Sequence, residues 1–299
     1  MENILLINSQ EECEKISNFI ESKRIALERD GVIIGLSGGL DSAVVAYLAV
    51  RGGKSENVNL LYMPDKDSKK SHYKDAITIA HELGQYLNVE DITHILDSIG
   101  IYKLLPFDLI PGTTLKSLLI KIGKKIENIN QENLMASRFS PTPNSFIAKG
   151  NAYATIKHRI RMVQLYHHAN IKNLLVVGAA NRTKLLTGAF SQWGCDQCAD
   201  IMPIIHLYRS QVESIADFLH IPDHIRNKPA DPDIMPGVDD KEALIGSFYT
   251  ADKILWMLEH GTPLSEIATK FDQITVNNIY DLYKRSQFMR ETPYSFLEG

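Results

Sequence analysis

Residues 31–50 read GVIIGLSGGLDSAVVAYLAV, and this stretch decides the expected fold. Residues 31–36 form a short, continuous run of branched apolar side chains, which is typical of a strand buried on both faces of a parallel sheet. Residues 41–50 are rich in alanine and have a helical pattern, and Gly52 and Gly53 then give a stop signal. The stretch predicts a strand, a glycine-containing loop and a helix in direct succession.

The same unit recurs along the chain. Apolar runs predict further strands at residues 58–63, 92–96 and 174–177, the second being the weakest. Amphipathic patterns predict helices at residues 13–29, 73–87, 153–166 and 209–219. Parallel strands that alternate with helices require right-handed crossovers. The predicted fold class is therefore α/β, an open parallel sheet with helices on both faces.

The remaining segments are interpreted as additions to a single domain over residues 1–299. Residues 99–148 have a less regular pattern, in which prolines bracket a lysine-bearing apolar segment, and they predict a helical or loop insertion. Three prolines exclude regular structure over residues 228–240, so a loop is expected there. Residues 240–299 predict a C-terminal helical part.

Composition narrows the class of protein. The formal net charge of -4 and the pI of about 6.2 argue against nucleic acid or an anionic membrane as the main partner. No apolar run reaches the roughly 18 residues of a spanning helix, and the acidic start lacks the features of a signal peptide. The three cysteines suit a reducing compartment. We therefore expect a cytoplasmic protein.

The loop between the first predicted strand and helix has the chemistry of a phosphate site. Adjacent Gly38 and Gly39 let the backbone approach a phosphate, and the N–H groups of the following helix favour an anion. Ser37 and Ser42 add hydroxyl donors. A carboxylate at Asp41 would repel phosphate unless a divalent cation lay between them, so Asp41 predicts Mg²⁺.

A helix cap and tight turn without a ligand is the alternative, because serine and aspartate are common caps. The strand, two serines, two glycines, aspartate and helix in one register favour a nucleotide instead. The loop matches neither GxxxxGK[ST] nor GxGxxG, so neither ordinary γ-phosphate hydrolysis nor a dinucleotide redox site is indicated.

The loop resembles that of the PP-loop ATP pyrophosphatases, and the whole chain resembles the ammonia-dependent NAD synthetases within that superfamily. The resemblance implies a Rossmann-like fold of the adenine nucleotide alpha-hydrolase type with about five strands. It also implies adenylation of the carboxylate of deamido-NAD by ATP, release of pyrophosphate, displacement of AMP by ammonia, and a homodimer that includes the helix of Arg159. The matching segments run in order from residue 35 to residue 240: 35–45, 63–64, 75–76, 159–162 with 166, 176–178, 188–190, 199–203, 236–237 and 239–240.

The resemblance carries several functional residues over. It assigns ATP binding to Gly35, Leu36, Ser37, Gly38, Gly39, Leu40, Asp41 and Ser42. It places Arg209 where the family has an ATP-contacting lysine, and it assigns substrate contacts to Arg159 and Asp200. Asp200 is expected at the acceptor substrate, facing the base or the incoming amine.

Elsewhere the sequence departs from the family. Lys184 falls where a second magnesium carboxylate is expected, which leaves Asp41 as the metal ligand, and Gln192 replaces a substrate-binding lysine. Phe288 and Met289 replace a C-terminal His-Lys pair. Three further positions differ: Ala179, Thr155 with Asn151 one helical turn earlier, and Asp231. The nucleotide half of the site is therefore better preserved than the deamido-NAD half.

The expected mechanism is adenylation without a covalent enzyme nucleophile. Asp41 with Mg²⁺, Arg209 and Lys184 would stabilise the developing negative charge, and Asp200 would act at the acceptor. Free ammonia or a separate ammonia donor is expected, because only about thirty residues precede the loop.

Three alternatives remain. The first is the same chemistry on another carboxylate, a sugar acid or a nucleotide-linked acid. The second is PP-loop sulfur transfer to RNA, suggested by the C-x-x-C pair Cys195 and Cys198. The third is a nucleotide-binding protein without turnover, suggested by Lys184.

Overall fold

Four parallel strands form the centre of the computed structural model, which describes residues 4–53, 55–105, 139–228, 247–291, 293, 294 and 296. In spatial order they are β3 (Leu87–Val89), β2 (Val58–Tyr62), β1 (Gly31–Gly35) and β4 (Leu174–Val177). All three pairings are parallel, and Val32 of β1 lies opposite Val58 and Leu175. This confirms the predicted parallel α/β sheet.

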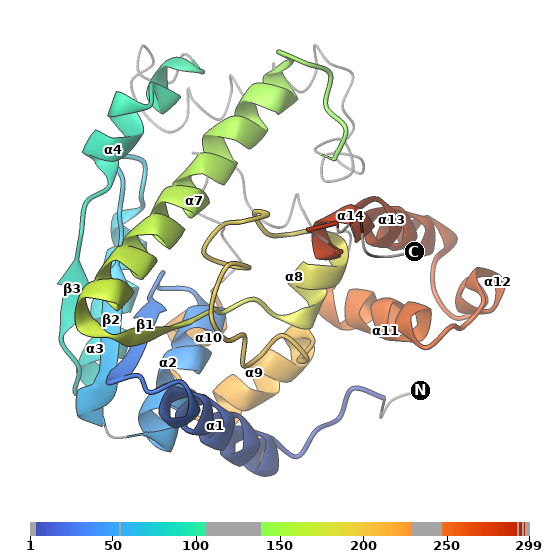
Figure 1. Ribbon diagram of the computed structural model, residues 1–299. Helices are drawn as coiled ribbons and strands as arrows, with labels where there is room; N and C mark the ends of the chain where they lie inside the picture. The colour runs from blue at the N-terminus through green and yellow to red at the C-terminus, as the bar shows by residue number, and fades with distance from the viewer. Residues whose placement is uncertain are drawn as a thin grey trace.

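Helices cover both faces of this sheet (Figure 1). Side chains alternate between the faces of a strand, so Ile34 and Ile33 of β1 belong to different core clusters. Around Ile34 the core includes residues of α1 (Ser9–Ala26), α2 (Leu40–Gly52), α3 (Lys70–Glu82) and α9 (Arg209–Phe218). Around Ile33 it includes residues of α4 (Thr93–Ser98) and α7 (Phe146–Lys172).

A third apolar cluster lies beside the sheet and contains the C-terminal helices. These are α11 (Phe248–Glu259), α12 (Leu264–Ile267) and α13 (Gln273–Arg285), and the short helix α14 (Gln287–Arg290) follows them in the chain. Leu186 of α8 (Arg182–Thr187) and Tyr208 join the same cluster. The remaining short elements are the 3-10 turns η1 (Ser55–Asn57) and η2 (Ile101–Lys103) and the helix α10 (Asp223–Arg226).

Two predictions about the sheet need correction. Residues 92–96 are not a strand, because Ile92 and Leu96 are buried at helical spacing and most of the segment belongs to α4. The strand is β3, which begins at Leu87, where the predicted helix 73–87 ended; Gly84, with φ +63°, follows the end of α3 just before it. The described residues hold four strands instead of about five, with a one-residue parallel bridge from Val177 to Ile201 beside them.

Local capping explains where several helices begin. Side-chain oxygens of Asn8, Ser145, Asn181, Ser247 and Asp272 each accept a hydrogen bond from a backbone N–H in the first turn that follows. Most of the predicted insertion, and the position Asp231, lie outside the described residues. Among the helices that the structure describes, none combines the length and apolar character that crossing a membrane requires.

A close contact between α1 and α2 gives a first test of the packing. A Cβ atom on Gly52 would lie 2.2 Å from the Ser17 carbonyl oxygen, whereas a Cβ on Gly53 would lie 3.2 Å from the movable Glu21 carboxylate. We expect Gly52→Ala to lower the free energy of unfolding by about 1–3 kcal/mol through overpacking. Gly53→Ala is the matched control and should have little effect. Urea denaturation measures both, and equal stabilities would contradict the contact.

Candidate active site

The backbone of α3 packs closely against the loop that follows β1. Gly38 has φ +76°, and a Cβ atom there would lie 2.3 Å from the carbonyl oxygen of His72. Any side chain at this position would therefore be both strained and in collision with backbone. Lys228 joins α3 to the loop, because its ammonium donates to Asp75 of α3 at 2.6 Å and to the Gly38 carbonyl at 3.4 Å.

Serine hydroxyls hold the loop amides in position. The Ser37 and Ser42 hydroxyl oxygens are 3.0 Å apart, and they accept hydrogen bonds from the backbone N–H groups of Gly39 and Ser37, respectively. Gly39, the N-cap of α2, has no side chain to cap the helix, so no side chain closes this helix start. The first turn of a helix has N–H groups without intrahelical partners. The first-turn N–H groups of α2 therefore lie beside two hydroxyls that bond each other and the backbone of the loop.

Asp41 is buried in the first turn of α2 and lies between two cations. Its Oδ2 is 2.8 Å from Lys184 Nζ, and its Oδ1 is 3.4 Å from Arg209 Nη1 and accepts a hydrogen bond of 3.1 Å from Asn181. Burial alone would raise the pKa of Asp41, but the charges of Lys184 and Arg209 and the hydrogen bonds outweigh it and lower that pKa. Asp41 is therefore ionised at neutral pH.

The partners of Asp41 come from segments that follow β4. Asn181 caps α8, which places Lys184 on the first turn of that helix, and Arg209 is the first residue of α9. The Thr183 hydroxyl accepts the Arg209 N–H at 2.8 Å and donates to Asp252 at 2.5 Å, which fixes α8, α9 and α11 to one another. Arg209 also pairs with Glu213 at 3.0 Å, so the two cations are balanced by two carboxylates, and Lys184 and Arg209 are the groups here that suit an anion.

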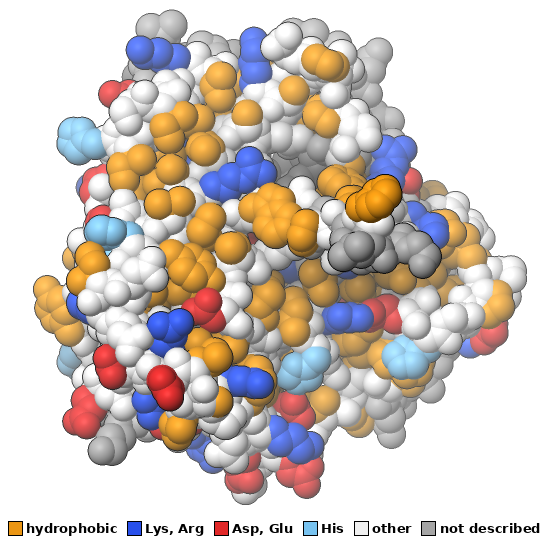
Figure 2. Space-filling view, in the orientation of Figure 1, with side chains coloured by type: hydrophobic (Ala, Val, Ile, Leu, Met, Phe, Trp, Pro, Cys, Tyr) orange, Lys and Arg blue, Asp and Glu red, His pale blue; other side chains and the backbone are white. Residues whose placement is uncertain are grey.

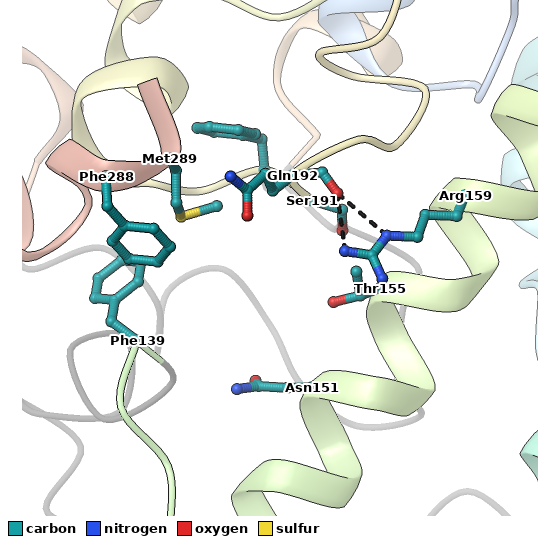
Figure 3. Close-up of a pocket in the computed structure, with 9 residues that line it drawn as sticks. Phe139, Asn151, Thr155, Arg159, Ser191, Gln192, Phe288 and Met289 are labelled. Carbon is teal, nitrogen blue, oxygen red and sulfur yellow. Dashed lines mark hydrogen bonds between the residues drawn. The ribbon is translucent and has the colours of Figure 1, made fainter. Parts of the chain in front are cut away.

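A cavity of about 130 Å³ lies where α7, α14 and the loop after α8 meet (Figure 3). Asn151, Thr155 and Arg159 lie at four-residue spacing, so they share one face of α7. Arg159 donates from Nε and Nη2 to the Gln192 carbonyl oxygen, both at 3.2 Å (Figure 3). The full lining is Phe139, Asn151, Thr155, Arg159, Phe190, Ser191, Gln192, Phe288 and Met289.

The structure thus brings together four of the five residues predicted to bind the acceptor: Arg159, Gln192, Phe288 and Met289. Phe288 forms part of the apolar side of this pocket. Its ring packs edge to face against that of Phe139, with 6.4 Å between the ring centroids. A hydrogen bond of 2.9 Å from Gln197 to the Met289 carbonyl ties the loop to α14.

Asp200 is not among the residues that line this pocket. Its Oδ2 accepts the backbone N–H of Val176 at 2.8 Å, and its Oδ1 accepts the Tyr166 hydroxyl at 3.0 Å. Burial of Tyr166, together with the negative charge of Asp200 and the hydrogen bond to it, raises the pKa of that hydroxyl. Asp200 therefore holds the segment that follows Cys198 against β4.

Two features of the site escaped the sequence analysis. Asn181 contacts Asp41 directly, and its only signal in the sequence is that of an asparagine before a short helical pattern. Ser191 lines the pocket and directly follows the matching segment 188–190, but nothing in the sequence marks Ser191 itself.

Cys195 lies close to His158 and Asp196, with its Sγ 3.3 Å from His158 Nδ1. Burial raises the pKa of the Cys195 thiol, and the negative charge of Asp196 raises it further. The thiolate is the nucleophile in cysteine chemistry, so this environment disfavours Cys195 as the attacking group of a sulfur-transfer enzyme.

The parallel sheet, with a phosphate-type loop at the carboxyl end of β1, defines an α/β protein with the Rossmann-like fold of PP-loop proteins. The profile of the NAD synthase family matches residues 12–103 and 110–293. The chain therefore belongs to the NAD synthase family. This confirms the family and the enzyme class, a ligase that forms C–N bonds, expected from the sequence.

Individual relatives match along almost their whole length. The NH₃-dependent NAD⁺ synthetase of Thermotoga maritima is 36% identical over 284 residues, which cover 95% of this chain and 98% of that protein. The NH₃-dependent NAD⁺ synthetase of Coprothermobacter proteolyticus is 33% identical, and the match covers 96% of this chain and 97% of that protein.

Solved structures agree on the fold. NMN synthetase from Francisella tularensis has a TM-score of 0.70 at 22% identity, and the NH₃-dependent NAD synthetase from Campylobacter jejuni, in complex with nitrate, has 0.68 at 24%. Each match covers 97% of this chain and 99% of the other.

The pairing of Lys184 with Asp41 gives a test of the phosphate contact expected of Lys184. We expect Lys184→Met to weaken ATP binding by about 10–100-fold, because a hydrogen bond to a charged group contributes roughly 1.5–3 kcal/mol. Arg182→Met is the matched control on the same helix, since Arg182 pairs with Glu259 instead, and it should lower thermal stability but not ATP affinity. Isothermal titration calorimetry measures both, and an unchanged affinity in Lys184→Met would exclude the phosphate contact.

Proposed function

We propose that the chain uses ATP to adenylate the nicotinate carboxylate of deamido-NAD, and that ammonia then displaces AMP. The observation that carries this proposal is the buried Asp41 at the start of α2, held between Lys184 and Arg209 in a chain that belongs to the NAD synthase family. The NH₃-dependent NAD⁺ synthetases among its relatives support the choice of reaction.

The mechanism that we propose needs no covalent nucleophile on the protein. The amides at the start of α2 and the hydroxyls of Ser37 and Ser42 would hold the phosphates of ATP. Lys184 and Arg209 would stabilise the negative charge that grows on the leaving pyrophosphate as the carboxylate attacks the α-phosphorus. Catalysis then rests on orientation and on preorganised charge.

Asp41 also fits a magnesium ion, provided that Lys184 turns away from the Asp41 carboxylate. Mg²⁺ is usually held in phosphate sites by one or two carboxylates together with phosphate oxygens and water, so a single carboxylate suffices. Both oxygens of Asp41 already have partners, and Lys184 is the nearest at 2.8 Å. Since the Lys184 side chain is 33% exposed and that of Asp41 only 7%, Lys184 has the freedom to turn toward phosphate. Bound Mg²⁺ would neutralise phosphate charge beside Asp41.

The pocket beside Arg159 and Phe288 supports binding of the acceptor's aromatic acid, because its lining is both polar and apolar. Its volume of about 130 Å³ is below the roughly 300–1,000 Å³ of pockets for whole drug-sized ligands, so it takes a ring-sized group. Arg159 is its cationic lining residue and suits a carboxylate. We place the nicotinate moiety there, beside Gln192 and Phe288.

A second candidate acceptor is nicotinate mononucleotide. Phe288 and Met289 stand where the family resemblance places two cationic residues, so fewer charges are present to hold a second phosphate group of the substrate. The likeness in fold to an NMN synthetase is in keeping with this candidate. Free ammonia or a separate donor protein would supply the nitrogen in either case.

Turnover on a panel of acids tests the proposal. The chain is incubated with ATP, Mg²⁺ and ammonium together with deamido-NAD, nicotinate mononucleotide or nicotinate, and AMP, pyrophosphate and amide are quantified. We expect equal amounts of the three products and a kcat/KM for deamido-NAD at least about tenfold above the other acids. A preference for the mononucleotide would favour the second candidate, and formation of ADP or no turnover would reject both.

Asp41→Asn is the variant that tests the metal assignment within the same assay. It should retain ATP binding without Mg²⁺, because Lys184 and Arg209 remain, and lose at least about 100-fold in Mg²⁺-dependent turnover. Glu213→Gln is the matched control, because Glu213 also pairs with Arg209 but is 46% exposed. Similar turnover in both variants would contradict the role of Asp41.

We also propose a homodimer with α7 in its interface, acting in the cytoplasm. Val163 and Ile171 of α7 are 52% and 70% exposed, and Figure 2 shows hydrophobic side chains along this helix. Exposed apolar surface of this kind marks protein contacts. The free thiols of Cys13, Cys195 and Cys198 support a reducing compartment.

The dimer is tested by placing a charge on α7. Val163→Glu should shift the molecule toward a monomer, because burying an unpaired carboxylate in an interface is unfavourable. Ile274→Glu is the matched control, since Ile274 is 60% exposed on α13. Sedimentation velocity measures both variants, and an equal effect of the two would rule out α7 as the interface.

A further inference from the structure

A cluster of three possible metal ligands lies outside the phosphate site. His158 comes from α7, and Cys195 and Asp196 come from the loop after α8. His158 Nδ1 is 3.3 Å from Cys195 Sγ and 3.4 Å from Asp196 Oδ2, and the three ligand atoms all lie within 4.8 Å of one another. In the part of the chain that the structure describes, this is the one such group of three.

A tight turn presses this cluster onto α7. The backbone N–H of Gly194 donates to the Ser191 carbonyl at 2.9 Å, and that of Cys195 donates to the His158 carbonyl at 3.1 Å. A Cβ atom on Gly194 would lie 2.8 Å from the His158 Cβ, so only glycine allows this approach. The positions of the three side chains are therefore set by backbone contacts as well as by their own interactions.

The spacing agrees with tetrahedral coordination of zinc. Zinc binds nitrogen and oxygen at about 2.0–2.2 Å and thiolate sulfur at about 2.3 Å. At a tetrahedral angle these lengths put nitrogen and sulfur about 3.5 Å apart, and nitrogen and oxygen about 3.4 Å apart. The observed distances of 3.3 and 3.4 Å are close to both values. Little movement of the side chains is needed to admit an ion.

We propose that His158, Cys195 and Asp196 bind one Zn²⁺ ion, with a fourth position for water. An imidazole, a thiolate and a carboxylate are all zinc ligands, and a thiolate selects against the hard ions Mg²⁺ and Ca²⁺. Binding replaces the thiol proton of Cys195, which is released to solvent. The side chains of His158 and Asp196 are 11% and 23% exposed, which leaves a path for the ion.

The ion would hold one wall of the pocket that Arg159 and Gln192 line. Arg159, the residue after His158, donates both its hydrogen bonds to the carbonyl of Gln192 in the same loop as Cys195. A metal that joins α7 to this loop therefore fixes the distance between Arg159 and Gln192. It acts as a positioning element for the pocket and does not touch the phosphate loop.

Cobalt binding tests the site independently of any activity. The metal-free, reduced full-length chain is titrated with Co²⁺, and we expect one equivalent to produce thiolate-to-cobalt charge-transfer absorption and tetrahedral visible bands that Zn²⁺ abolishes. Cys195→Ser should remove the charge-transfer band, and His158→Asn and Asp196→Asn should each weaken Co²⁺ affinity at least about tenfold. Thermal melting shows whether each variant remains folded.

Cys198→Ser is the matched control, because Cys198 lies on the same turn but outside the three-ligand group. It should retain the charge-transfer band and the stoichiometry. Absence of the band in the unaltered chain, or its persistence in Cys195→Ser, would overturn the proposal. An equal loss of binding in Cys198→Ser would also overturn it, since the C-x-x-C pair would then be the ligand set.

Discussion

The charge balance around Asp41 is the interaction on which the rest of the site depends. A buried carboxylate without partners costs several kcal/mol, so Asp41 requires Lys184, Arg209 and Asn181 to stay in contact with it. These contacts join residues 140 and 168 positions apart in the sequence, and they fasten the starts of α8 and α9 to the start of α2. Loop, sheet edge and cations therefore form one unit.

The same balance would change when a triphosphate binds. Asp41 is held by three partners, whereas the Lys184 side chain is one-third exposed. An incoming triphosphate adds several negative charges at the helix start, where the cations gain more from phosphate than from a single carboxylate. Lys184 is the group with room to exchange partners, so a lysine in this position is compatible with a cation at Asp41 only when phosphate is present.

The sequence predicted the central strands, the loop and the family because these depend on local signals. Buried apolar runs identify β1, β2 and β4, and the serine-glycine stretch identifies the loop. The helical spacing of Ile92 and Leu96 was misread as a strand because a short apolar run fits either structure. The contact of Asn181 with Asp41 and the place of Ser191 in the pocket depend on tertiary packing, which no local pattern encodes.

The short helix α8 explains why the C-terminal helices matter to a site built mainly on the sheet. Its first residues contact Asp41, and its far end leads through Gly188 into the pocket lining, so a helix of six residues, about 9 Å long, links the two sites. At that far end the Leu186 carbonyl accepts hydrogen bonds from Ser286 at 2.9 Å and Arg290 at 3.0 Å. A Cβ atom on Gly188 would lie 2.6 Å from the Ser286 Cβ, so α8 cannot shift without moving α13 and α14. The C-terminal helices thereby fix the separation between the place where phosphates would bind and the place where the carboxylate would be presented.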